Sequence, residues 1–332
     1  MIRVAINGFG RIGRQALKVA LDHPDISVVA INDLSDAATL AHLFQYDTAY
    51  GHFPRPMEAQ KGSLNIDGIS IALLAERDPA QLPWKELRID IVLECTGRFT
   101  DPIAARAHIQ AGAKRVLISA PAKGEAPVVL MGVHPHPARV AEGADIVSNG
   151  SCTTNCMAPV LAVLDTAFGV EHALVSTVHA ATADQNLQDG PHTDLRRARA
   201  AMHNIVPTTT GAAETVAKAL PSLAGRMDGV AWRVPVLTGS VAMVVAVLKK
   251  PATVATVNEA FTRAARTVRW QGIVQVNTEP LVSSDIVGSA ASAIVDLPLT
   301  RVVGKYLVHV AAWYDNEWAY ANRLIEMARA LA

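Results

Sequence analysis

The sequence predicts an α/β fold, with a parallel sheet in the N-terminal part of the chain. Residues 2–6 form a short apolar run, and a glycine-rich turn followed by helix-forming residues comes next. The chain returns to an apolar run at 26–31, which completes a strand–helix–strand unit of the kind that makes parallel sheets. Apolar runs at 89–97 and 114–121 continue the strand pattern. Because the chain has 332 residues, a second domain is also expected.

The composition is that of a soluble globular protein, since half of the residues are hydrophobic and 18% are charged. The 30 basic and 30 acidic residues balance, so there is no surplus charge to recruit nucleic acid or an anionic membrane. No apolar run is long enough to span a bilayer, and the N-terminus lacks the features of a signal peptide. Three cysteines are too few for a disulfide framework, so a reducing, cytoplasmic location is expected.

The turn after the first strand contains Gly8-x-Gly10-x-x-Gly13, and Asp33 follows twenty residues later, after the second strand. In such a pattern the first glycine allows a tight turn, the second lets the backbone approach a pyrophosphate, and the third lets the helix pack on its strand. The helix N-terminus faces the phosphates, and the acid accepts hydrogen bonds from the adenosine ribose. The pattern predicts a dinucleotide site. The alternative is a tight glycine turn with Asp33 capping a helix.

Polar residues follow two of the other apolar runs. Thr96 and Gly97 end the run 89–97, and Ser119 lies near the end of the run 114–121. Ligands of open parallel sheets bind beyond the carboxyl ends of the strands, so these three residues are expected to line the cofactor crevice. Cys95 is expected inside its strand, as a small buried apolar residue.

The segment S-N-G-S-C-T-T-N-C, residues 148–156, places Cys152 where a helix is expected to begin. Ser151 and Thr153 are of the types that satisfy the first N–H groups of a helix. A thiolate there is stabilised by the helix dipole, which predicts a lowered pKa and a nucleophilic sulfur, and the same amides could hold an oxyanion. Cys156, one turn further along, is expected to serve packing. The alternative for Cys152 is a buried, unreactive thiol.

A nucleophilic cysteine needs a base, and His179, at the end of the apolar run 173–179, is the candidate. Taken alone, His179 could equally be a structural histidine. A zinc site is the competing use of Cys and His. It is not expected here, because the Cys-x-x-x-Cys has no second ligand pair at metal-site spacing.

Groups suited to anions follow downstream. The segment 194–201 carries three arginines, and 206–213 is a hydroxyl-rich entry to a helix with Gly211 in its turn. Arg233 lies inside an apolar strand, where an unpaired guanidinium would be costly, so it is predicted to bind a phosphate. The alternatives are a solvated helix face for Arg196 and Arg199, and an internal carboxylate partner for Arg233.

The motifs N-G-F-G-R-I-G-R, S-C-T-T-N-C-M-A-P, V-H-A-A-T-A-D-Q, D-L-R-R-A-R-A-A, P-T-T-T-G-A-A, R-V-P and W-Y-D-N-E-W together resemble those of the phosphorylating glyceraldehyde-3-phosphate dehydrogenase family. The resemblance implies a Rossmann-type parallel sheet domain over 1–150 and an α+β catalytic domain with a large, mostly antiparallel sheet over 151–316. It also implies that the C-terminal helix, 317–332, packs back on the first domain, and that the protein is a homotetramer.

The resemblance assigns roles by position. Cys152 corresponds to the nucleophile and His179 to the base. It places the substrate and inorganic phosphates at Ser151, Thr153, Thr182, Arg197, Thr210, Gly211 and Arg233. Of these, Thr182 and Arg233 correspond to the substrate-phosphate pocket, Ser151, Thr210 and Gly211 to the site of the attacking phosphate, and Arg197 lies near both. The expected cofactor-binding residues are Gly8, Gly10, Arg11, Ile12, Gly13, Asp33, Arg77, Thr96, Gly97, Ser119, Asn316 and Tyr320.

The implied reaction is the NAD-dependent conversion of glyceraldehyde 3-phosphate and inorganic phosphate to 1,3-bisphosphoglycerate, through a hemithioacetal and a thioester on Cys152. Asp33 favours NAD over NADP because it repels a 2′-phosphate, and Leu34 and Pro191 match the NAD-type pattern. Erythrose-4-phosphate dehydrogenase is the closest alternative, although it typically lacks the counterparts of Thr182 and of the Thr210-Gly211 pair. Another thioester-forming reductase, such as aspartate-semialdehyde dehydrogenase, and a non-catalytic dinucleotide-binding module are the remaining alternatives.

Overall fold

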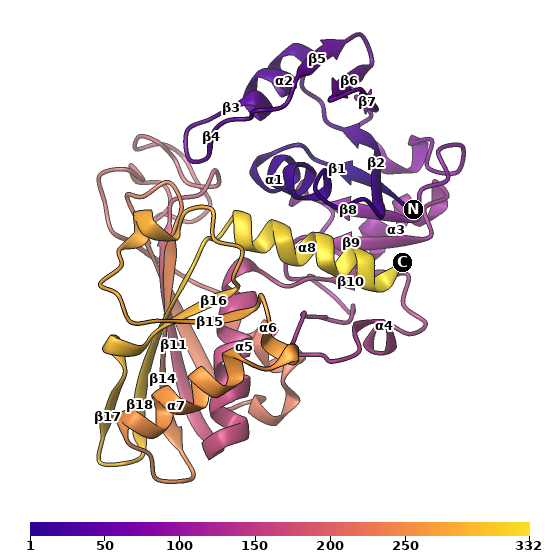
Figure 1. Cartoon of the computed structure of the whole chain (residues 1–332). Helices are drawn as coiled ribbons and strands as arrows, with labels where there is room; N and C mark the ends of the chain where they lie inside the picture. Colours follow the sequence, from indigo (N-terminus) through magenta and orange to yellow (C-terminus); the bar gives the residue numbers. More distant parts are fainter. The chain divides into compact units, whose positions relative to one another are not determined.

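The structure is a computed structural model that describes all 332 residues (Figure 1). The chain forms two compact units. The first consists of Met1–Leu130, His136–Gly150 and Ala321–Ala332, and the second of Met131–Pro135 and Ser151–Tyr320. None of the helices is both long and apolar enough to cross a bilayer.

The first unit is built on an eight-stranded sheet with the strand order β10-β9-β8-β1-β2-β7-β6-β5. The six strands from β10 to β7 in this order are parallel, and β6 and β5 extend the sheet as an antiparallel hairpin edge. This confirms the predicted Rossmann-type parallel sheet. The strands are β1 (Ile2–Asn7), β2 (Ile26–Asn32), β5 (Met57–Gln60), β6 (Ser63–Ile66), β7 (Ile69–Leu74), β8 (Ile91–Glu94), β9 (Arg115–Ile118) and β10 (Ile146–Ser148).

The helices of this unit begin where the sequence supplies N-terminal caps or glycine. The Asp36 and Asp101 side chains each accept a backbone N–H in the first turn of α2 and α3, while α1 starts directly after Gly10. The bounds are α1 (Arg11–Ala20), α2 (Ala37–Gln45), α3 (Pro102–Gln110), α4 (Pro137–Val140) and the 3₁₀ turn η1 (Pro79–Gln81), with a small hairpin of β3 (Tyr46–Asp47) and β4 (Gly51–His52). The first unit also includes most of α8 (Trp318–Leu331), whose Arg329 pairs with Asp25 at 2.7 Å.

The second unit contains a larger sheet with the order β12-β13-β11-β14-β18-β16-β15, and β17 pairs with β18. Only the β11–β13 and β15–β16 pairs are parallel, which confirms the predicted, mostly antiparallel sheet. The strands are β11 (Val170–Ala180), β12 (Val206–Thr208), β13 (Met227–Val234), β14 (Ser240–Leu248), β15 (Val274–Asn277), β16 (Ala293–Asp296), β17 (Arg301–Val303) and β18 (Leu307–Tyr314).

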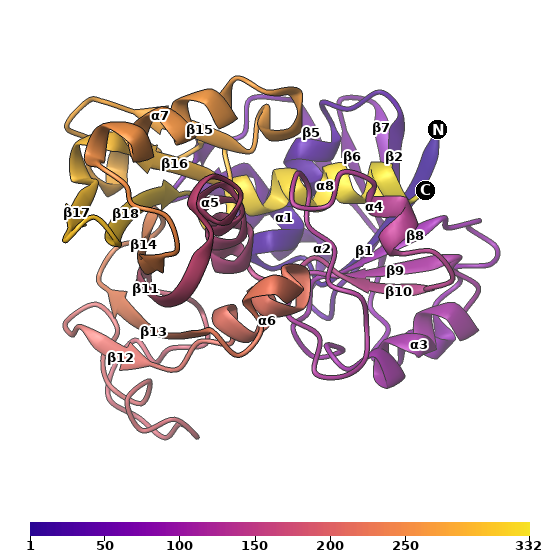
Figure 2. The same cartoon turned by 90° about the horizontal axis from the view of Figure 1, so that it is seen from below.

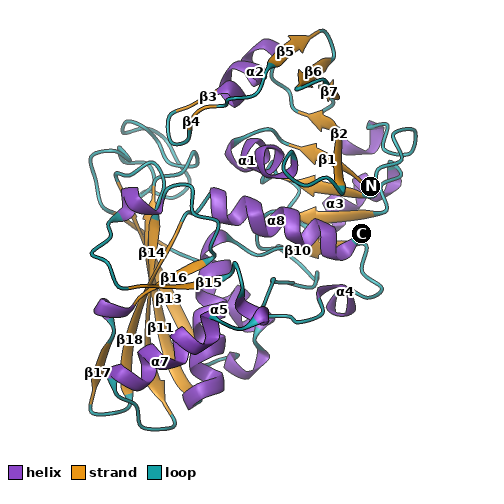
Figure 3. Cartoon of the chain, viewed as in Figure 1, coloured by secondary structure: helices purple, strands orange, loops and turns teal.

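Helices cover one face of this second sheet. Figure 3 shows α5 and α7 on the same side of the strands, and Figure 2 shows α6 beside α5. The opposite face carries apolar side chains that no helix covers, and Leu174 and Leu307 on it are exposed. The helices and turns are α5 (Cys152–Phe168), α6 (Ala212–Ala219), α7 (Val254–Ala265), η2 (Pro221–Leu223), η3 (Val268–Trp270), η4 (Ser283–Ile286) and η5 (Leu297–Leu299).

Two local predictions are wrong. Cys95 does not lie inside a strand, because β8 ends at Glu94, whose carboxylate accepts the Thr96 N–H at 2.8 Å and so starts a turn. Residues 194–201 form turns instead of a helix, because the N–H groups of Ala200 and Ala201 donate to the Asp189 carboxylate at 3.0 Å and the Asn186 carbonyl at 2.9 Å, and not to the carbonyls four residues before them.

Candidate active site

The glycine turn of the first unit meets three different requirements. Gly8 has φ +93°, and a Cβ there would lie 2.7 Å from the Thr96 nitrogen. A Cβ on Gly13 would lie 2.1 Å from the Gly8 carbonyl oxygen, so this position allows the close contact between helix and strand. A Cβ on Gly10 would meet no protein atom within 4 Å. Packing thus requires Gly8 and Gly13, while Gly10 borders open space at the start of α1, where a ligand phosphate can approach.

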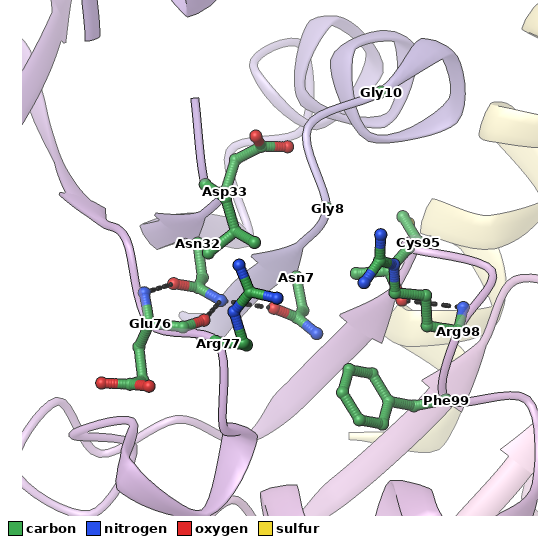
Figure 4. A pocket seen from close by; sticks show the side chains of 12 residues that line it. Asn7, Gly8, Gly10, Asn32, Asp33, Glu76, Arg77, Cys95, Arg98 and Phe99 are labelled. Atoms are coloured by element: carbon green, nitrogen blue, oxygen red, sulfur yellow. Dashed lines mark hydrogen bonds between the residues drawn. The ribbon is translucent and has the colours of Figure 1, made fainter. Parts of the chain in front are cut away.

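A pocket opens beyond the carboxyl ends of β1, β2 and β8, as Figure 4 shows. The Asp33 carboxylate holds the turn, since it accepts the N–H groups of Phe9 at 2.8 Å and Ser35 at 2.9 Å. The residues that line the pocket are Asn7, Gly8, Gly10, Asn32, Asp33, Leu34, Glu76, Arg77, Cys95, Thr96, Arg98 and Phe99. The open space at Gly10 and the carboxylate at the strand end fit a dinucleotide.

The other predicted cofactor residues of the first unit do not line this pocket. Gly97 has φ +70° in the turn after β8, and Ser119 follows β9 and hydrogen bonds to Cys95. Arg11 and Ile12 lie in the first turn of α1, where the Arg11 guanidinium forms a two-pronged ion pair with Asp47 at 2.8 and 3.1 Å. The sequence did not indicate Arg98 or Phe99, which come from the irregular segment after Gly97.

A chain of buried polar groups connects with the residues of this pocket. The Trp84 indole N–H donates to Nδ1 of His108 at 2.9 Å, and Nε2 of His108 lies 3.2 Å from a Glu94 carboxylate oxygen. Because an indole can only donate, Nδ1 carries the lone pair and Nε2 donates to Glu94. Glu94 also accepts from the Asn7 amide at 2.6 Å and from the Thr96 N–H at 2.8 Å. Sequence reasoning missed this chain, although an acid inside an apolar strand was a usable signal.

In the second unit, Cys152 is the first residue of α5. Ser151 is the N-cap, and it forms a reciprocal pair of hydrogen bonds with Thr154, at 3.0 Å through its own hydroxyl and 3.2 Å through its backbone N–H. The Thr153 hydroxyl lies 4.0 Å from the sulfur, and its backbone N–H also faces it. The thiol therefore lies at a capped helix start, as the sequence predicts.

His179, the last residue but one of β11, faces this thiol. Its Nε2 atom lies 3.4 Å from Cys152 Sγ, and its Nδ1 atom lies 2.7 Å from the carbonyl oxygen of Ala180. A carbonyl can only accept, so Nδ1 carries the hydrogen and the lone pair of Nε2 points at the sulfur. The predicted nucleophile and base are therefore brought together, with the base in the tautomer that can take the thiol proton.

The protonation of this pair differs from the sequence prediction. Burial raises the pKa of the Cys152 thiol, although Arg233 and hydrogen bonds from Thr153 act in the opposite direction. Burial and the charge of Arg233 lower the pKa of His179 to about 3. Both shifts favour the uncharged thiol and the uncharged imidazole at neutral pH. The expected lowering of the thiol pKa is wrong here, because the loss of water outweighs the helix N-terminus.

Tyr314 lies beneath the pair. Its hydroxyl joins the hydroxyls of Thr153 at 2.9 Å and Thr177 at 2.8 Å, and its ring meets the His179 ring edge-on at 6.0 Å between centroids. Thr153, expected at a phosphate, is thus also bound inward to the protein core. The W-Y-D-N-E-W motif contains Tyr314, but sequence reasoning assigned it no role, since it is 161 residues from Thr153.

Arg233 lies on β13 in register with His179 on β11. One of its terminal nitrogens donates to the Thr182 hydroxyl and, at 3.4 Å, to the Ala180 carbonyl. No carboxylate lies within ion-pair distance of it, and its Nε atom is buried without a hydrogen bond. The alternative of an internal carboxylate partner is therefore wrong, and a guanidinium with unused donors beside the thiol suits an anionic ligand.

Asp184 connects two of the other residues that are predicted to bind phosphate, Thr182 and Arg197. Its carboxylate accepts from the Thr182 hydroxyl and from Arg197 Nη1 at 2.7 Å. The Arg197 Nε atom donates to Thr208 at 3.0 Å and lies 3.4 Å from Asp194. Thr182 and Arg197 thus converge on one carboxylate, a geometry that resembles their expected use on a phosphate. The sequence did not indicate Asp184.

The other predicted phosphate residues lie at the start of α6. Gly211 precedes the helix as its N-cap, and the Thr210 hydroxyl accepts the Ala212 N–H at 3.2 Å. Arg196 is exposed and Arg199 forms an exposed ion pair with Asp189, so the solvated interpretation of these two arginines is confirmed.

Asn316 and Tyr320, the predicted nicotinamide residues, are both almost fully buried. The side-chain oxygen of Asn316 accepts from the Ser240 hydroxyl at 2.8 Å and from the Gly239 N–H at 3.2 Å. Tyr320 lies in the first turn of α8. The amide of Asn316 is thus held in one orientation.

A dinucleotide-type sheet in one unit and, in the other, a thiol–imidazole pair beside an arginine without an ion-pair partner are the features of an NAD-dependent oxidoreductase. The comparisons with known proteins define it further. Residues 2–102 match the NAD binding domain of glyceraldehyde 3-phosphate dehydrogenase, and residues 151–316 match its C-terminal domain. The chain belongs to the glyceraldehyde-3-phosphate dehydrogenase family, and NAD is its cofactor.

Similarity to relatives extends over the full length. The chain is 51% identical to glyceraldehyde-3-phosphate dehydrogenase of Kitasatospora aureofaciens, covering 100% of this chain and 99% of the relative. It is 49% identical to glyceraldehyde-3-phosphate dehydrogenase 1 of Streptomyces avermitilis, over 98% and 97% of the two chains. It is 47% identical to the enzyme of Geobacillus stearothermophilus, over 100% and 98%.

Proposed function

We propose that the protein catalyses the NAD-dependent oxidative phosphorylation of D-glyceraldehyde 3-phosphate to 1,3-bisphosphoglycerate. The observation that carries this proposal is the 3.4 Å approach of the Cys152 sulfur to Nε2 of His179, with Arg233 in register beside the imidazole. A thiol, a base with its lone pair on that thiol and an unpaired guanidinium suit an aldehyde that carries a phosphate.

The chain's own groups supply the proton transfers. Nε2 of His179 takes the thiol proton as Sγ bonds to the aldehyde carbon, and returns it to the oxygen to complete the hemithioacetal. Nε2 takes the hydroxyl proton again as this carbon is oxidised to the thioester, and bound NAD accepts the hydride. Inorganic phosphate then attacks the thioester, and the thiolate of Cys152 leaves.

Anion-binding residues orient the two phosphates. Thr182 and Arg233 hold the phosphate of the substrate, because both already share a hydrogen bond next to the base. Ser151, Thr210 and Gly211 hold the attacking phosphate at two helix N-termini, where the positive end of the helix dipole favours an anion. Arg197 is assigned a place near both phosphate sites. When a phosphate binds, it replaces the Asp184 carboxylate as the partner of the Arg197 guanidinium.

Residues of both units bind the cofactor. In the first unit the turn residues Gly8, Gly10 and Gly13 receive the pyrophosphate and Asp33 the adenosine ribose. In the second unit Asn316 binds the nicotinamide carboxamide, with Tyr320 beside it. NAD is preferred over NADP because the carboxylate of Asp33 repels a 2′-phosphate. The remaining cofactor contacts come from Arg11, Ile12, Arg77, Thr96, Gly97 and Ser119.

The protein is a cytoplasmic homotetramer in this proposal. Leu174 pairs with Val245, and Val247 with Leu307, on the face of the second sheet that no helix covers. Exposed apolar side chains in neighbouring strands suit contact with a second copy of the chain. Light scattering of the purified protein tests this, since a monomer at micromolar concentration contradicts it.

The activity is tested by mixing the protein with NAD⁺, inorganic phosphate and glyceraldehyde 3-phosphate while following NADH absorbance. Turnover that depends on phosphate and is lost in Cys152→Ser supports the proposal. The assay is repeated with erythrose 4-phosphate, and a higher kcat/KM for the tetrose would favour the second candidate function. Activity of the Cys152→Ser variant equal to that of the wild type would exclude the thiol mechanism.

A further inference from the structure

The hydroxyl of Ser240 makes hydrogen bonds to two segments at the end of the second sheet, one next to His179 and one at Asn316. It accepts the Ala180 N–H at 3.1 Å and donates to the Asn316 side-chain oxygen at 2.8 Å. These directions are fixed, because an amide N–H can only donate and the hydroxyl has one hydrogen to give. Ser240, Ala180 and Asn316 are all buried, so water does not compete for these bonds.

The backbone geometry explains why a side chain is used at this point. The pairing of β11 with β14 ends at Val178 and Val241, so the Ala180 N–H lies beyond the last pair of the ladder. Gly239, with φ +88° and with no room for a Cβ beside Ser283, turns the chain into β14 immediately before Ser240. The Ser240 hydroxyl then takes the place of the missing backbone acceptor.

The same hydroxyl fixes the orientation of the Asn316 amide. The Gly239 N–H donates to the same Asn316 atom at 3.2 Å, so that atom is the oxygen. The NH₂ group points the other way, and it makes no hydrogen bond within the chain. It is therefore available to donate to the carbonyl oxygen of a carboxamide.

The second hydrogen bond of Ser240, from the Ala180 N–H, connects it to the proposed base His179. The carbonyl of Ala180 accepts from Nδ1 of His179 at 2.7 Å, while its N–H is held by Ser240. Hydrogen bonds and the Ala180 backbone thus run without interruption from Cys152 through His179 and Ser240 to Asn316.

We propose that Ser240 is a positioning residue that sets the His179 tautomer through Ala180 and the direction of the Asn316 amide toward the nicotinamide carboxamide. This inference rests on the proposed function, which assigns the carboxamide to Asn316. The proposed function assigns Ser240 no contact with substrate or cofactor. Ser240 acts by holding two groups that make such contacts, so its removal affects thiol reactivity and NAD binding together.

The test is Ser240→Ala, read by two measurements besides turnover. The dissociation constant of NAD⁺ is measured by calorimetry, and the rate of Cys152 alkylation by iodoacetamide is measured against pH without NAD⁺. We expect NAD⁺ binding to weaken and alkylation at neutral pH to slow by about tenfold each, the factor expected for one lost buried hydrogen bond. Ser240→Thr keeps the hydroxyl and should restore both values to within about twofold.

Ser176→Ala is the matched control, because Ser176 lies on the same strand pair, opposite Met243, and its hydroxyl makes no hydrogen bond. It should leave both measurements unchanged. If Ser240→Ala does not fold, Ser240→Cys fills the same space with a much weaker hydrogen-bonding group and is measured instead. Normal NAD⁺ binding together with a normal alkylation profile in a folded variant overturns the inference.

Asn316→Ala separates this inference from the proposed function. If Asn316→Ala weakens NAD⁺ binding but removal of the Ser240 hydroxyl does not, the positioning role is wrong and the proposed function stands. If Asn316→Ala binds NAD⁺ normally, the assignment of Asn316 in the proposed function is wrong.

Discussion

Two histidines in this chain are almost completely buried, and their hydrogen bonds are reversed. His108 is fully buried on α3 of the first unit, and His179 is 4% exposed near the end of β11 of the second. At His108 the Nδ1 atom accepts from the Trp84 indole and Nε2 donates to Glu94. At His179 the Nδ1 atom donates to a backbone carbonyl and Nε2 presents its lone pair to a thiol.

The difference shows what separates a structural histidine from a reactive one. Both nitrogens of His108 are engaged by strong partners that do not change during a reaction, an indole N–H and a carboxylate. His179 is fixed on one side only, and its other nitrogen faces a group that can give up a proton. Burial is nearly the same for both, so the partners and not the burial decide the role.

Replacement of His179 by Asn is expected to have the largest effect. Without a base at Nε2, kcat for glyceraldehyde 3-phosphate should fall by about 10²- to 10⁴-fold, the range typical of general-base catalysis. The matched control is His108→Asn, which should lower the free energy of unfolding but leave kcat of the folded protein within about twofold, because His108 acts through structure. Steady-state NADH formation measures both, and equal losses of kcat would abolish the distinction.

Trp84→Phe sharpens the comparison from the structural side. It removes the N–H that His108 Nδ1 accepts and leaves a small cavity, because the indole is fully buried. The free energy of unfolding should fall by about 2–4 kcal/mol, from an unpartnered buried nitrogen and lost packing together.

Urea titration measures this loss, while kcat should stay unchanged. Trp270→Phe, in η3 of the second unit, is a suitable control for the loss of an indole, because Trp270 packs against Arg269 and makes no indole hydrogen bond. If Trp84→Phe has the same free energy of unfolding as the wild type, the hydrogen bond from the indole does not stabilise the first unit.

The two histidines also differ in a neighbouring charge. Arg233 lies beside His179, and its positive charge lowers the pKa of both His179 and Cys152. Arg233→Ala should raise KM for the phosphorylated triose by about 10- to 100-fold, the range that lost hydrogen bonds to a charged group give. The control Arg199→Ala removes an arginine of an exposed ion pair and should leave KM unchanged. An unaltered KM in Arg233→Ala would place the substrate phosphate elsewhere.

The sequence predicted the parts of this comparison that depend on local pattern. The strand, glycine turn, helix and strand from β1 to β2 follow from apolar period and glycine spacing. Cys152 at a helix start and His179 at a strand end were also readable, because each motif is continuous along the chain. The turn at 194–201 was not, because Asp189 and Asn186, which lie outside the segment, take the N–H groups that a helix would need.

The partners that fix each group could not be predicted, because they come from distant segments. Tyr314 is 137 residues from Thr177, and Ser240 is 76 residues from Asn316. No periodicity carries information over such separations. The same holds for protonation: a helix N-terminus was visible in the sequence, but the burial that outweighs it at Cys152 depends on the packed structure.

The smallest expected effect is a difference in acid sensitivity. The pKa of His179 is about 3 in the folded chain and about 6.5 when unfolded, so between these values the unfolded chain binds a proton that the folded chain does not. The contribution of neutral His179 to the free energy of unfolding is fully present above pH 6.5. Between pH 6.5 and pH 3 it falls by about 1.4 kcal/mol per pH unit.

Urea unfolding at pH 7, 6 and 5 should therefore show a steeper loss of stability in the wild type than in His179→Asn, since asparagine does not titrate. Trp270→Phe, which changes no hydrogen bond of either buried histidine, should keep the wild-type slope and serves as the control. Parallel slopes for wild type and His179→Asn would mean that His179 is protonated as readily in the folded chain as in the unfolded one. The neutral thiol–imidazole pair, on which the contrast with His108 depends, would then not describe the resting protein.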